Sequence, residues 1–70
     1  YEQKGMLFET IEQWEKLVEM NSGNIEYNLY LATLYERAEQ QDKARMQYRK
    51  ILRIQPNNQQ AQQRLASLGG

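Results

Sequence analysis

The chain repeats its own pattern after 34 residues, and this internal repeat restricts the fold more than any other feature of the sequence. Aromatic, aliphatic, small and amide residues recur in pairs at that offset: Tyr1 and Tyr35, Trp14 and Tyr48, Leu17 and Ile51, Met20 and Ile54, Asn24 and Asn58, Leu31 and Leu65, and Ala32 and Ala66. A repeat of this length indicates an array of similar units that pack against their neighbours. An unrelated four-helix bundle would need only amphipathic periodicity and would not explain the self-similarity.

Apolar residues spaced by threes and fours predict amphipathic helices along the chain. The predicted segments are Met6 to Met20, Ile25 to about Ala38 with Asn24 as its cap, a third helix capped by Asp42 and ending near Ile54, and a last helix that follows a cap at Asn57 or Asn58 and carries Leu65 and Leu68. Gly5 is expected in a turn that ends an earlier segment, and Gly69 with Gly70 is expected to end the last helix. Pro56 stops the third helix, because proline lacks the backbone donor that a helix needs.

Small and aromatic side chains are expected to interlock between the second and third helices. The predicted core residues there are Leu31, Leu34, Ala32, Tyr35, Ala44, Tyr48 and Ile51, with Leu52 and Ile54 as further candidates. Ala32 and Ala44 permit a close approach of the two backbones, and Tyr35 and Tyr48 fill the space beside them.

This arrangement resembles the tetratricopeptide repeat (TPR), whose pattern runs W-x2-L-G-x2-Y, then A-x3-F, then P over about 34 residues. The resemblance implies an all-α fold in which antiparallel αα-hairpins stack as a segment of a right-handed solenoid. It divides a single domain, residues 1–70, into a partial repeat (1–24, mainly its second helix), a complete repeat (25–58) and the first helix of a further repeat or a cap (59–70). Thr10, Ser22 and Asn28 depart from the family's usual Ala, Pro and Trp, so packing or helix termination should be weaker there.

The same resemblance implies that first helices line a concave groove, which would bind an extended peptide or a helix of a partner protein. Carried onto this sequence, the groove residues are Glu26, Leu29, Tyr30, Thr33, Glu36, Arg37, Gln60, Gln63, Arg64 and Ser67. For Leu29 and Tyr30 the alternative is packing between neighbouring helices. Some family members clamp a C-terminal carboxylate with Lys and Asn on one helix and a base on a later one. Leu29 and Thr33 take the first two places here, so a chaperone-tail ligand is disfavoured.

The second expected function is structural self-association through exposed terminal helix faces, because a repeat hairpin cannot bury its apolar face alone. The chain opens on Tyr1, so we expect a fragment that enters its first repeat out of phase and leaves Ile11 and Trp14 exposed in a lone monomer. Further helices of a longer protein or a second copy would then cover them. The self-association candidates are Ile11, Trp14, Glu15, Glu19, Arg49 and Arg53.

Charge is segregated along the chain although the total is zero. Residues 1–26 hold six acidic and two basic side chains, and residues 27–70 hold three acidic and seven basic ones. The offset also places Glu9 on Lys43, Glu15 on Arg49 and Glu19 on Arg53, so neighbouring second helices would carry opposite charges at equivalent heights. Each exposed pair would contribute only about 0–1 kcal/mol and would be screened by salt.

Composition disfavours catalysis. The sequence has no cysteine and no histidine, which removes thiolate metal sites, disulfides and the commonest general base. No nucleophile with a partnering base and no phosphate-binding glycine loop is present, so we expect no enzyme, no metal and no cofactor. Arg45, Arg49 and Arg53 form a basic ridge, yet no aromatic stacking platform is interleaved with it, so nucleic-acid binding is disfavoured.

No targeting signal is visible. No apolar run approaches the roughly 20 residues of a membrane span, and membrane insertion is not expected. The compartment stays open, with the cytoplasm slightly favoured.

Overall fold

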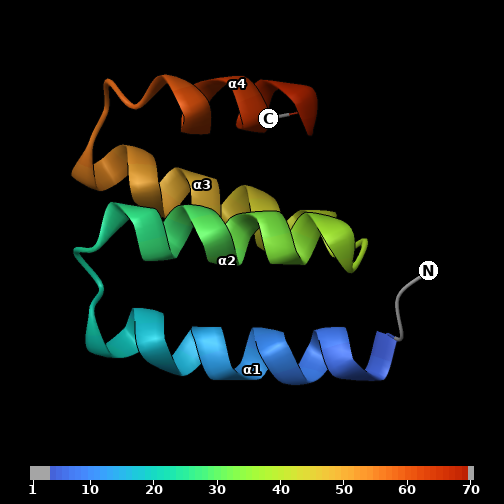
Figure 1. Cartoon of the computed structure of the whole chain (residues 1–70). Coiled ribbons are helices and arrows are strands. Elements are labelled where there is room, and N and C mark those ends of the chain that lie inside the picture. Colours follow the sequence, from blue (N-terminus) through green and yellow to red (C-terminus); the bar gives the residue numbers. More distant parts are fainter. Residues whose placement is uncertain (1–3, 70) are drawn as a thin grey trace.

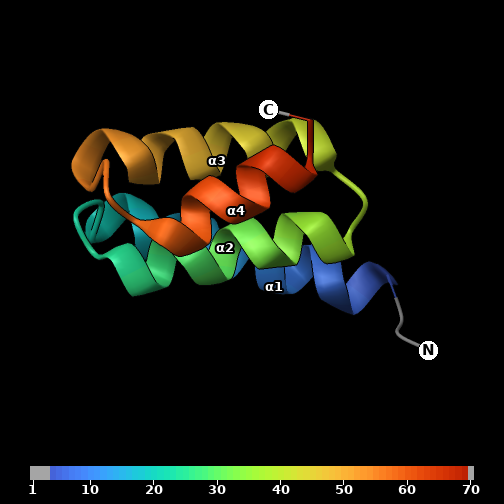
Figure 2. The same cartoon turned by 90° about the horizontal axis from the view of Figure 1, so that it is seen from above.

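The structure, a computed structural model, describes residues 4–69 and forms four α-helices there. These are α1 (Lys4–Met20), α2 (Ile25–Arg37), α3 (Gln41–Ile54) and α4 (Gln59–Ser67). Consecutive helices run antiparallel, and the α2–α3 hairpin lies between α1 on one side and α4 on the other (Figure 1). Seen from above, α4 crosses over the α2–α3 pair while α1 lies beneath it (Figure 2). The expected all-α fold of stacked helical hairpins is confirmed.

Asparagine side chains begin α2 and α4, as predicted. The Oδ1 atom of Asn24 accepts from the backbone N–H of Tyr27 at 3.1 Å, and Oδ1 of Asn58 accepts from that of Ala61 at 2.8 Å. Each bond satisfies one of the N–H groups that the first turn of a helix leaves without a partner. The alternative cap, Asn57, lies one residue too early.

The end of α2 contains a residue in the left-handed conformation. Glu39 has φ +62°, and its backbone N–H donates to Glu36 O while that of Gln40 donates to Tyr35 O, at 3.0 and 2.9 Å. These two bonds are those of the Schellman motif, which usually places glycine at the left-handed position. Glutamate is therefore an uncommon choice at this turn.

Two predicted helix boundaries were wrong. Gln40, not Asp42, precedes α3, and its side chain makes no capping bond. Asp42 lies inside the first turn, where its carboxylate pairs with Arg45. Gly5 lies inside α1 and not in a turn, because a glycine ends a helix only where the chain needs a left-handed residue. Tyr1, expected at the end of an earlier helix, lies outside the described residues.

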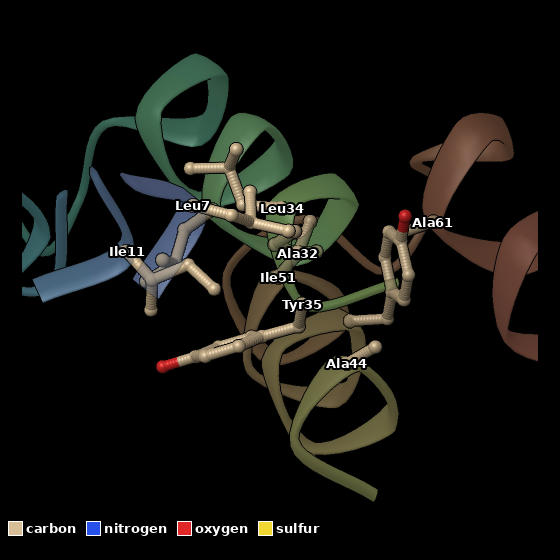
Figure 3. Close-up of a cluster of buried hydrophobic side chains, with 10 residues drawn as sticks. Leu7, Ile11, Ala32, Leu34, Tyr35, Ala44, Ile51 and Ala61 are labelled. Atoms are coloured by element: carbon tan, nitrogen blue, oxygen red, sulfur yellow. The ribbon is translucent and has the colours of Figure 1, made fainter. Parts of the chain in front are cut away.

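The core lies where α2 meets α3 and extends toward both outer helices (Figure 3). Its buried apolar members are Leu7, Ile11, Leu31, Ala32, Leu34, Tyr35, Ala44, Tyr48, Ile51 and Ala61. The core predicted for the second and third helices is thereby confirmed for its central residues. Leu52 is only partly buried, and Ile54 is exposed.

The expectation that Ile11 is exposed was wrong. Ile11 retains 4% of its surface and belongs to the core. Its equivalent at the 34-residue offset is Arg45, whose Nη1 donates to Leu68 O just past α4. The position therefore faces the helix that follows, which is α2 in the case of Ile11. The exposed apolar residues of α1 are instead Met6, Phe8, Leu17 and Met20.

Candidate interaction surface

The ten residues expected in a concave groove all lie on α2 and α4, and we refer to them together as the α2–α4 surface. Its exposed members are Glu26, Tyr30, Arg37, Gln60, Gln63, Arg64 and Ser67. Leu29, Thr33 and Glu36 are half-buried. Most of this set is therefore exposed to solvent, and the half-buried members have contacts inside the protein.

Glu36 joins three helices and is not a free groove residue. Its carboxylate forms an ion pair with Arg64 of α4, whose Nε donates to Oε2 at 3.3 Å. The same Oε2 accepts from the hydroxyl of Tyr48, a fully buried residue of α3. This network therefore joins α4 to both helices of the hairpin, including the two helices that carry the α2–α4 surface.

Burial and charge shift the pKa values of this network. Burial alone would raise the pKa of Glu36, but hydrogen bonds from Arg64 and Tyr48, together with the positive charge of Arg64, lower it. Burial, followed by the hydrogen bond to Glu36, raises the pKa of Tyr48 to about 12. The network is thus held with a charged carboxylate and a neutral phenol over the whole neutral range.

Tyr30 supplies a partly exposed aromatic ring at the α1 side of the surface. Its ring centroid lies 4.5 Å from that of Trp14, which also meets Tyr27 edge-on at 5.3 Å. Tyr30 nonetheless keeps 43% of its surface exposed. One part of the Tyr30 ring therefore packs on α1, as the packing alternative expected, and the rest is exposed to solvent. Tyrosine suits such a place, because it gives a large contact area at low entropic cost.

Leu29 and Thr33 serve the protein itself. Leu29 packs against the core, which matches the packing alternative for this residue. The hydroxyl of Thr33 donates to the carbonyl oxygen of Tyr30 at 2.7 Å. Neither side chain offers a partner the free polar group that a carboxylate clamp would require.

A groove lies between α1 and α3, with residues of α2 also lining it. This α1–α3 groove has a volume of about 1010 Å³. Glu12, Glu15 and Glu19 line it from α1, while Lys50 and Arg53 line it from α3. Of the three charge pairs expected between neighbouring second helices, Glu19 and Arg53 both line this groove, and the basic Lys16 of α1 lines it as well. Solvent in the open groove screens such charges.

Tyr35 forms part of the floor of the α1–α3 groove. Its hydroxyl donates to Oε2 of Glu15 at 2.5 Å, and the Nζ atom of Lys43 lies 5.9 Å from its ring centroid. Burial, the hydrogen bond to Glu15 and the charge of that carboxylate all raise the pKa of Tyr35. Glu15, which the 34-residue offset places on Arg49, thus bonds to a tyrosine of α2.

Two buried amides in the same floor were missed by sequence reasoning. Asn28 and Gln47 are 2% and 5% exposed, and Nε2 of Gln47 donates to Oδ1 of Asn28 at 2.5 Å. Nδ2 of Asn28 donates to the carbonyl oxygens of Ser22 and Asn24 at 3.1 and 2.7 Å. Asn28 therefore links the α1–α2 turn to α3, and the predicted local weakening at this position is replaced by a satisfied polar contact. The sequence did contain a signal for a buried amide, because Gln47 falls on the apolar stripe of its helix.

The basic ridge is partly engaged in the fold. The guanidinium of Arg45 pairs with Asp42 and donates to Leu68 O at 3.0 Å, so it holds α4 against α3. Arg53 points into the α1–α3 groove. The three arginines thus do not form one continuous row of outward-facing cations.

Residues 4–69 were also considered as a metal site and as a membrane span. No group of three or more acidic side chains in this part of the chain could hold a metal ion. No helix there has both the length and the apolar character needed to cross a membrane.

The geometry defines an all-α protein of the helical-hairpin repeat class. A family profile, tetratricopeptide repeat, matches residues 25–68, which is more than half of the chain. The chain belongs to the tetratricopeptide repeat family. Comparison with curated proteins and comparison with solved structures each gave no match. Tetratricopeptide repeats generally mediate protein–protein interaction and are non-catalytic modules.

Proposed function

We propose that the chain is a non-catalytic module of a larger scaffold that binds an extended peptide or a helix of a partner protein on its α2–α4 surface. The observation that carries the proposal is the half-exposed Tyr30 ring on a surface whose two helices are fixed by the Glu36–Arg64 ion pair. The ring is an apolar anchor, and the exposed amides of Gln60 and Gln63 on α4 provide groups that can hydrogen-bond to a ligand.

Preorganisation supports the same proposal. Glu36 bonds at once to α3 and α4, so the helices need not rearrange when a ligand arrives. The cost of ordering then falls mainly on the ligand, which favours binding of a flexible segment. Glu26 places a negative charge on the exposed face of α2, so the surface suits a partner segment that carries a basic group there.

A peptide library tests this proposal. Random peptides displayed on phage would be selected on the immobilised chain, and a selected peptide would be titrated into isotope-labelled protein. We expect amide shifts on α2 and α4, and loss of binding in the variants Tyr30→Ser and Gln63→Glu. Phe8→Ser is the matched control, since it also changes an exposed aromatic but lies on α1. Shifts confined to the α1–α3 groove, or equal binding by all three variants, would contradict the proposed surface.

A further inference from the structure

The face of α3 that packs against α2 is covered completely. Ala44, Tyr48 and Ile51 have no exposed surface, and Gln47 retains 5%. The hydrogen bond from Gln47 to Asn28 shows that this face is directed at α2. In this complete repeat, the second helix therefore presents one defined face to the first.

The corresponding face of α1 is open. At the 34-residue offset, its members are Thr10, Gln13, Trp14 and Leu17. Gln13 and Leu17 are exposed, and Thr10 and Trp14 are only half-buried. Within residues 4–69 no helix stands before α1 as α2 stands before α3. Gln13 also carries the same side chain as its buried equivalent Gln47.

The complementary face is open on α4. Gln62 is exposed and stands at the position equivalent to Asn28. Its Nε2 donates to Pro56 O at 2.7 Å, just as Nδ2 of Asn28 donates to Ser22 O at 3.1 Å. Ser22 and Pro56 are themselves 34 residues apart. The side chain of Gln62 is thus anchored to its preceding turn in the way that Asn28 is.

The two open faces are halves of one interface. Asn28 uses its carbonyl oxygen to accept from Gln47, and the corresponding groups are the carbonyl oxygen of Gln62 and the amide of Gln13. Ala66, which is exposed, corresponds to Ala32 and supplies the small residue that permits a close helix approach.

We propose that the chain binds a second copy of itself head to tail, with α4 of one protomer seated on the Thr10–Leu17 face of α1 in its partner. Gln13 then donates to Gln62 across the interface, and Ala66 lies against Thr10. The pair completes a hairpin equivalent to α2–α3. This interface leaves the α2–α4 surface unused, so the inference does not depend on the proposed function.

Charge favours the same partner. Residues 1–26 carry four more acidic than basic side chains, and residues 27–70 carry four more basic than acidic ones. A head-to-tail contact brings α1 of one protomer, which has four acidic and two basic side chains, near the basic α3 of the next. Exposed pairs of this kind are weak and screened by salt, so association should weaken moderately as salt is added.

A head-to-tail contact is heterologous, because it joins two different surfaces. One free face remains at each end of a dimer, so assembly continues beyond the dimer. In sedimentation velocity the wild-type chain should therefore show species that grow steadily with concentration. A chain that stays monomeric throughout the concentration series would overturn the proposal.

Variants at the two ends give the sharper test. Gln13→Arg blocks the α1 face and Ala66→Arg blocks the α4 face, and each should weaken association by about tenfold or more. Both positions are exposed, so each variant should fold, and circular dichroism is the check on this. Phe8→Ser is the control on α1, because Phe8 is equivalent to Asp42, which is exposed in the complete repeat.

Mixing the two blocked variants distinguishes head-to-tail contact from a symmetric one. Each variant keeps the face that the other has lost, so an equimolar mixture should form a heterodimer and nothing larger. If the mixture stays monomeric, if Ala66→Arg alone still associates, or if Phe8→Ser abolishes association, the proposed interface is wrong. Gln62→Ala and Leu17→Glu serve as second variants should either arginine variant fail to fold.

Discussion

Replacing Gln47 with leucine tests the buried amide contact that links α2 to α3. The substitution keeps the volume of a side chain that is 5% exposed but removes the donor to Oδ1 of Asn28. The two amide hydrogens of Asn28 keep their partners, the carbonyl oxygens of Ser22 and Asn24. A single buried acceptor is therefore left unsatisfied.

The expected loss of stability follows from this one unsatisfied acceptor. An unsatisfied buried polar group costs about 1–3 kcal/mol. In a domain of this length, each kcal/mol lowers the melting temperature by roughly 4–8 °C. We therefore expect Gln47→Leu to melt about 10 °C below the wild type, near the middle of the combined range. No buried side-chain nitrogen or oxygen among the described residues lacks a partner in the wild type. The Oδ1 atom of Asn28 would therefore be a new unsatisfied group in the variant.

Thermal melting followed by circular dichroism measures this change, and urea unfolding gives the free energy of unfolding independently. Gln41→Leu is the matched control on the same helix, and it should change stability by less than about 0.5 kcal/mol because Gln41 is exposed. A double-mutant cycle with Asn28→Ala should show coupling of about 1 kcal/mol between the two sites. If Gln47→Leu melts at or above the wild-type temperature, the reasoning from a satisfied buried amide pair is refuted.

Four further predictions concern backbone conformation and pH. Glu39→Gly should raise stability by about 0.5–1 kcal/mol in urea unfolding, because Glu39 holds φ +62°, and Gly69→Ala should lower it at φ +86°; equal signs for the two changes would contradict the assigned turns. Gly5→Ala should raise the melting temperature slightly, since Gly5 is helical and a Cβ there meets nothing within 4 Å; a lower melting temperature would indicate the turn instead. The pKa of Tyr48 is raised to about 12, so its contribution to the free energy of unfolding is full below pH 10 and is lost as the pH rises toward 12. Urea unfolding of Tyr48→Phe should therefore show a smaller loss of stability at alkaline pH than the wild type. The pKa of Glu36 is lowered, so its contribution to the free energy of unfolding is present above the unfolded-state pKa of 4.5 and is lost as the pH falls. If Glu36→Gln loses stability in acid just as the wild type does, this role of Glu36 is excluded.

Local signals in the sequence predicted much of the fold. Asn24 and Asn58 cap helices because a short side-chain acceptor can reach the first turn from the residue before it. Ala44 and Tyr48 are buried because they fall on one stripe of a helix with a 3.6-residue period. The start of α3 could not be fixed in the same way, because Asp42 forms an ion pair with Arg45 and leaves the cap position to a residue without a capping bond.

The candidate surface was only partly predictable. Sequence reasoning placed ten residues on α2 and α4, and the structure keeps most of them exposed. It did not foresee that Glu36 would bond to Arg64 and Tyr48, because those partners come from helices that are 28 and 12 residues away along the chain. The burial of Ile11 was missed for a similar reason, since one helix stripe does not show which of two neighbours it faces.

The sequence by itself determined that this chain forms helices with caps, that it contains a 34-residue repeat, and which residues could be core. These properties depend on neighbours within a few turns and on the match between two copies of one pattern. The tertiary structure alone decided which amides and carboxylates meet across helices, and therefore which polar residues hold the fold and which stay available to a partner. That choice depends on distances between side chains far apart in the sequence, which only the packing of α1 to α4 sets.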